Sequence, residues 1–205
     1  SAAVRRRAGS RPSGHIAAVG FDLYSQLLAD AVEIRRASRE GREPARRRTA
    51  ALIDLPVSAH LADTYVADEG QRLDLYRRLG IADSDAAISA IAEELRDRFG
   101  APPAEAERLL EVARLRAGAS EAGLASLLIE EGRLIVRLGE LQPGLAARAL
   151  VASPIPELSM SGNQIRSRER VTGGEARRLA ARLVQGIVAE VRHWEATNAA
   201  GAPLA

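Results

Sequence analysis

The sequence contains neither cysteine nor lysine. All 29 basic residues among its 205 residues are arginine. The absence of cysteine excludes disulfides, thiolate nucleophiles and zinc sites with Cys ligands. The absence of lysine excludes a P-loop, whose Lys contacts the β- and γ-phosphates, and Schiff-base catalysis. This polypeptide alone is therefore not expected to carry out either chemistry.

Aromatic residues and long hydrophobic runs are also scarce. Aromatics make up 3% of the chain, whereas hydrophobic residues make up 46%. The composition is therefore sufficient for a core, which must consist mainly of Leu, Ile, Val and Ala. No apolar run approaches the ~18 residues of a membrane helix, and no secretory signal is visible. We accordingly expect no membrane partner.

The charge is unevenly distributed along the chain. Residues 1–48 carry eleven Arg and five acidic residues, a balance of +6. Residues 49–205 carry eighteen Arg and twenty-two acidic residues, a balance of −4. A basic arm joined to a mildly acidic body suggests contact with a polyanion or with another domain. A solvated linker within a longer protein is the alternative.

The hydrophobic pattern divides the chain into three parts. Residues 1–48 are expected to form a basic arm, a linker helix at about 20–39 and an Arg-rich linker. Residues 49–196 are expected to form a compact domain, and residues 197–205 a flexible tail. We predict an α+β fold, in which the linker helix precedes a domain of one strand, three helices, two hairpins and a closing helix.

The predicted elements of the domain follow from periodicity and from start and stop signals. A short apolar run closed by Pro56 indicates a strand, and Thr172 with Glu175 forms a capping box that begins the last helix. The expected inward residues of that helix include Trp194. The remaining helices and hairpins are expected at residues 68–79, 84–98, 102–116, 124–138, 143–151 and 158–166.

No catalytic or metal-binding constellation is recognisable. His15, His60 and His193 are far apart in sequence, and none has the spacing of a metal site. There is no G-x-S-x-G nucleophile elbow, and the adjacent glutamates at 93–94 and 130–131 are expected at the surface. We therefore predict no catalytic residue, no metal site and no cofactor for this chain.

The surface of the helix at 84–98 is more informative. Its apolar stripe places Glu93, Glu94 and Asp97 on the opposite side, where they form an acidic face. Ordinary solvated charge is one interpretation of such a face. The other is a docking surface for a basic partner, because complementary charge sets orientation and specificity.

Several motifs resemble one bacterial family. The first is the segment S-G-H-I-A-A-V-G-F-D-L-Y at residues 13–24, which includes Ser13, Gly14, His15, Gly20, Phe21, Asp22, Leu23 and Tyr24. Further motifs follow in order at residues 53–56, 71–79, 94–100 and 109–116. Together they are similar to the C-terminal (TRCF) domain of the transcription-repair coupling factors and to the segment that leads into it.

The resemblance implies a regulatory role without catalysis. Family members are ATP-dependent DNA translocases that remove stalled RNA polymerase and recruit the repair protein UvrA. ATP and Mg²⁺ would belong to an upstream motor. The C-terminal domain packs on a UvrB-like module and masks its UvrA-binding surface, and the motif E-L-x-D-R-F-G maps this contact onto Glu94 and Asp97. The resemblance also implies a bacterial cytoplasmic location.

Nucleic-acid binding is the alternative function. The arginines that would contact phosphates are Arg35, Arg36, Arg46, Arg47 and Arg48. Such binding would depend steeply on salt and little on sequence. The segment lacks interleaved aromatics for base stacking, and the rest of the chain is acidic.

Overall fold

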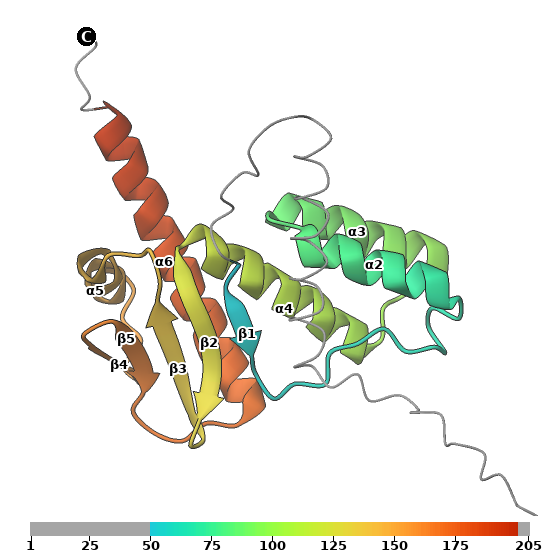
Figure 1. The fold of residues 1–205 in the computed structure, drawn as a ribbon, viewed down its shortest axis with the longest axis horizontal. Coiled ribbons are helices and arrows are strands. Elements are labelled where there is room, and N and C mark those ends of the chain that lie inside the picture. Colours follow the sequence, from blue (N-terminus) through green and yellow to red (C-terminus); the bar gives the residue numbers. More distant parts are fainter. Residues whose placement is uncertain (1–49, 201–205) are drawn as a thin grey trace, which may run out of the picture.

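The computed structural model describes residues 50–200, which form a mixed sheet with helices packed on one face and a helical layer beside it (Figure 1). In chain order the elements are β1 (Leu52–Asp54), α2 (Glu69–Ile81), α3 (Asp85–Phe99), α4 (Ala104–Glu121), β2 (Leu124–Glu130), β3 (Arg133–Leu138), α5 (Pro143–Ala152), β4 (Leu158–Ser161), β5 (Gln164–Ser167) and α6 (Gly173–Ala200). The α+β class and both predicted hairpins are confirmed.

The sheet has the strand order β1-β2-β3-β5-β4. The strand β1 pairs in parallel with β2, and the other three pairs are antiparallel. The hairpin between β2 and β3 turns at Glu131 and Gly132, which both have positive φ (51° and 78°). This left-handed turn suits the right-handed twist of the two strands.

Two hydrophobic cores lie side by side. The larger contains the inner face of the sheet, α5, α6 and the second half of α4. The smaller contains α2, α3, the first half of α4 and the loop residues Leu61 and Val66. Because α4 contributes Leu109 to the smaller core and Leu115 to the larger, this helix joins the two.

Side-chain caps fix where three of the helices begin. Asp68 accepts a hydrogen bond from the backbone N–H of Gln71 at the start of α2 (2.7 Å), and Ser84 accepts one from Ala87 at the start of α3 (3.4 Å). The predicted capping box before α6 is confirmed. The backbone N–H of Thr172 donates to Glu175 Oε2 (2.8 Å), and that of Glu175 donates to Thr172 Oγ1 (3.3 Å).

Three local predictions are wrong. The helix expected at 102–116 begins at Ala104, after both prolines, and continues to Glu121 because its last turns are buried against the sheet. Trp194 was expected to point inward but is 39% exposed, because α6 extends past the sheet at its C-terminal end (Figure 1). The same helix includes Thr197, which the sequence analysis assigned to the tail.

Candidate docking surface on helix α3

The core side of α3 determines which of its carboxylates face outward. Ile88, Ile91 and Leu95 are buried in the smaller core. Glu93 and Asp97 lie on the other side of the helix and are exposed. Neither of them forms an ion pair with any residue in the described part of the chain. Both carboxylates are therefore exposed to solvent on this side of α3.

Glu94 is placed differently. Its side chain is only 24% exposed and lies where α2 packs against α3. Arg78 on α2 donates through Nη2 to Glu94 Oε2 at 2.6 Å, and Arg98 donates through Nη1 to Glu94 Oε1 at 2.5 Å. The sequence placed Glu94 on the open face because a helical wheel omits the neighbouring helix that supplies Arg78.

These contacts determine the protonation of the network. The hydrogen bond from Arg78 lowers the pKa of Glu94, and this effect exceeds the opposing effect of partial burial. The same hydrogen bond raises the pKa of Arg78. Glu94 and Arg78 are consequently both charged at neutral pH.

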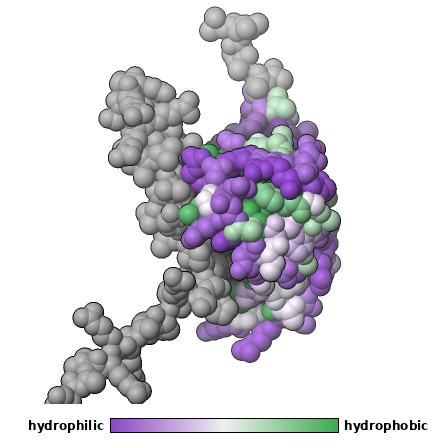
Figure 2. All heavy atoms as spheres, turned by 90° about the vertical axis from the view of Figure 1, so that its right-hand side faces the viewer, coloured by the Kyte–Doolittle hydropathy of each residue, from purple (hydrophilic) through white to green (hydrophobic). Residues whose placement is uncertain are grey.

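Further polar contacts extend the network on both sides of Glu94. Arg98 also donates to Gln71 Oε1 at 2.9 Å, and its guanidinium lies 5.0 Å from the centre of the Phe99 ring. On the other side, Asp74 contacts Arg77 at 2.5 Å and Arg78 at 3.8 Å. Figure 2 shows the molecule from this end, where hydrophilic residues cover most of the described surface around a smaller hydrophobic area.

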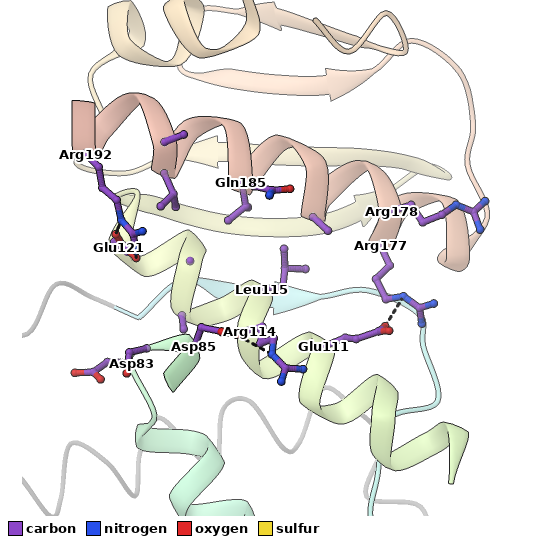
Figure 3. Close-up of a pocket in the computed structure, with 17 residues that line it drawn as sticks. Asp83, Asp85, Glu111, Arg114, Leu115, Glu121, Arg177, Arg178, Gln185 and Arg192 are labelled. Carbon is purple, nitrogen blue, oxygen red and sulfur yellow. Dashed lines mark hydrogen bonds and ion pairs between the residues drawn. The ribbon is translucent and has the colours of Figure 1, made fainter. Parts of the chain in front are cut away.

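A groove that the sequence analysis missed lies between α4, α6 and the start of α3 (Figure 3). Its volume is about 840 Å³, and its apolar lining includes Leu115, Gly118 and Val184. A Cβ atom at Gly118 would lie 2.8 Å from a methyl group of Val184, so a larger residue would require the two helices or the Val184 side chain to shift. Spacing along a single helix cannot reveal such a feature.

Ion pairs surround the groove. Arg177 on α6 contacts Glu111 on α4 at 3.1 Å, and farther along the same two helices Arg192 contacts Glu121 at 2.6 Å (Figure 3). Arg114 contacts Asp85 at 2.8 Å. These three arginines already have carboxylate partners, so their contacts hold the helices together rather than offering an unpaired charge to a ligand.

Residues 50–200 contain neither a cluster of metal ligands nor a membrane-spanning helix. Within that range, no group of three or more His, Cys, Asp or Glu side chains is arranged to hold a metal ion. None of the helices there is long and apolar enough to cross a membrane. Outside the described residues lie the S-G-H-I motif at 13–24, the linker helix expected at about 20–39, and Arg35, Arg36, Arg46, Arg47 and Arg48. The predictions made for them remain predictions.

The comparisons with known proteins agree with the motifs. Residues 55–146 match the TRCF domain family. The transcription-repair-coupling factor of Mycobacterium tuberculosis is 41% identical over 170 residues, which cover 72% of this chain and 14% of that protein. The corresponding protein of Myxococcus xanthus is 36% identical over 131 residues, with 64% and 10% covered.

A solved structure shows the same fold. The crystal structure of the C-terminal domain of a transcription-repair coupling factor superposes with a TM-score of 0.58 at 16% identity, covering 69% of this chain and 93% of that one. The chain thus corresponds in length to a small part of the full relatives and to nearly all of the isolated domain. We conclude that this chain belongs to the transcription-repair coupling factor family and carries its C-terminal TRCF domain.

Proposed function

We propose that this domain is a non-catalytic regulatory module that docks, through the acidic face of α3, onto a positively charged surface of the UvrB-like module in the same protein. The contact would mask the UvrA-binding surface until the protein engages RNA polymerase. ATP, Mg²⁺ and DNA would be bound by the motor of the parent protein, which would act in the bacterial cytoplasm. The domain itself would transfer no group.

One observation carries this proposal. Glu93 and Asp97 are exposed and have no ion-pair partner among residues 50–200, although ten of the arginines in that range are paired with carboxylates. Two unpaired carboxylates one helical turn apart can receive guanidinium groups without first losing an internal bond. Glu94, between them in sequence, adds its charge at the edge of the same face.

Charge reversal in the full-length protein tests the proposal. The double variant Glu93→Arg/Asp97→Arg should repel the basic module and expose the UvrA-binding surface. UvrA affinity and the ATPase rate should both rise, the affinity by about tenfold if docking weakens by ~1.4 kcal/mol. The domain should remain folded, because exposed surface substitutions usually change stability by less than about 0.5 kcal/mol.

A matched control separates docking from a general effect of charge. The variant Glu131→Arg/Glu169→Arg makes the same change in net charge at exposed positions after β2 and β5, away from α3. It should leave UvrA affinity unchanged within about twofold. Equal effects of the two double variants, or no effect of either, would contradict docking through α3.

A further inference from the structure

Both oxygens of the Glu94 carboxylate are engaged within the domain. Each of its oxygens accepts a short hydrogen bond from a different guanidinium, with Arg78 at 2.6 Å and Arg98 at 2.5 Å. A docking arginine binds a carboxylate most strongly through two parallel hydrogen bonds, one to each oxygen. At Glu94 a docking arginine would therefore compete with two internal guanidinium groups, one at each oxygen.

Both internal arginines have another contact nearby. Asp74 lies 3.8 Å from Arg78, and Gln71 accepts a hydrogen bond from Arg98 at 2.9 Å. Arg98 also stacks near Phe99, which holds its guanidinium beside the seam. Loss of the bond to Glu94 therefore leaves neither cation isolated, and the two side chains, which are 34% and 45% exposed, remain hydrated.

We propose that Arg78 and Arg98 compete internally for Glu94 and thereby limit the strength of interdomain docking. A basic partner reaches Glu93 and Asp97 without competition, whereas at Glu94 it competes with two internal ion pairs. The exchange changes the free energy of the system only slightly, because each exposed ion pair contributes little free energy. It makes the contact weaker and easier to reverse than three free carboxylates would. This inference rests on the proposed docking function.

Removal of the two competitors tests it in the full-length protein. The variant Arg78→Gln/Arg98→Gln frees both oxygens of Glu94 for the basic partner. Docking should tighten, so that UvrA affinity and the ATPase rate both fall. We expect a three- to tenfold drop in UvrA affinity, given the usual strength of two exposed ion pairs.

The matched control is Arg77→Gln/Arg96→Gln. It removes the same charge from the same two helices, but neither residue contacts Glu94. Its effect on UvrA affinity should be less than twofold. If both double variants lower the affinity equally, long-range charge explains the result and the exchange of partners is refuted.

The outcomes also separate this inference from the proposed function. If Glu93→Arg/Asp97→Arg leaves UvrA affinity unchanged, docking through α3 is wrong. If that variant raises the affinity but Arg78→Gln/Arg98→Gln behaves like its control, docking stands and internal competition is wrong. Thermal unfolding followed by circular dichroism verifies that each variant is folded. If Arg78→Gln/Arg98→Gln does not fold, the two single variants are measured instead. Arg78→Gln and Arg98→Gln should each lower UvrA affinity by an intermediate amount. No drop in affinity with either variant would refute the competition.

Discussion

The helical layer and the sheet layer of this domain are stabilised differently. The sheet layer has the larger core and a long helix, α6, packed across it. The helical layer has a smaller core, and its outer seam is held by the ion-pair network around Glu94. The proposed docking surface lies on the layer whose surface charges can change partners at low cost. The proposed function thus assigns binding to the helical layer, whereas the larger core lies in the sheet layer.

A buried arginine helps to connect the two layers. Arg116 on α4 is 5% exposed and donates to the backbone carbonyl of Leu79 near the end of α2. The carbonyl of Arg116 accepts from the hydroxyl of Ser120 (2.8 Å), which in turn accepts from the backbone N–H of Ala51, just before β1 (3.0 Å). The end of α2, the helix α4 and the start of the sheet are therefore joined by polar contacts as well as by packing.

The strongest test of this comparison is a pair of cavity-forming substitutions, one in each core. Leu109→Ala and Leu183→Ala remove side chains that are 1% and 2% exposed, and each should lower the free energy of unfolding by about 2–5 kcal/mol. Urea unfolding is followed by far-ultraviolet circular dichroism and by the fluorescence of Trp194, the single tryptophan, on α6. Because α4 belongs to both cores, the two signals should change together. Separate transitions would show that the layers unfold independently.

The second test removes the polar link between the layers. Arg116→Met keeps most of the apolar stem but leaves the carbonyl of Leu79 without this donor. Loss of a partner for a buried polar group should cost about 1–3 kcal/mol in chemical denaturation. The control is Arg114→Met on the same helix, whose side chain is 39% exposed. That variant should lose less than about 1 kcal/mol, and equal losses would argue against a special role for Arg116.

The third test concerns the sheet layer alone. Thr172→Ala removes half of the capping box that begins α6, and the expected loss of stability is about 1 kcal/mol. The lost interaction is local to the first turn of the helix. Thr197→Ala near the other end of α6, where the hydroxyl donates only to the carbonyl of His193, should change stability far less. Thermal unfolding of both variants provides the measurement.

The smallest effect is expected in the helical layer and depends on pH. Glu94→Gln should lower the free energy of unfolding by at most about 1 kcal/mol at pH 7, since the pair is partly exposed. The pKa of Glu94 is lowered in the folded state, so its contribution is complete above the unfolded value of about 4.3 and disappears as the pH falls through the lowered folded value. The difference between wild type and variant should therefore vanish in acid. A difference that stays constant down to pH 2 would contradict the assigned ion pairs. The control is Glu93→Gln on the same helix, whose exposed side chain has no ion pair among residues 50–200.

The sequence predicted individual elements well where a local signal exists. The capping box at Thr172, the stop at Gly100 and the turn at Glu131 and Gly132 all lie where the pattern placed them. Predictions that depended on a neighbouring element were less successful. Glu94 and Trp194 were assigned from helical wheels, which carry no information about the arginine of a second helix or about where a helix extends past its sheet.

The amino-acid sequence by itself determined the class of fold, the order of its elements, the acidic character of α3 and the family resemblance, because these depend on residue types and on spacing along one segment. Only the tertiary structure decided which carboxylates of α3 are free and which are engaged. It also decided that Arg116 is buried and that Gly118 lies against Val184 beside a groove. Each of these depends on side chains that approach from a different element. Such contacts form only when distant segments pack, and no local periodicity encodes them.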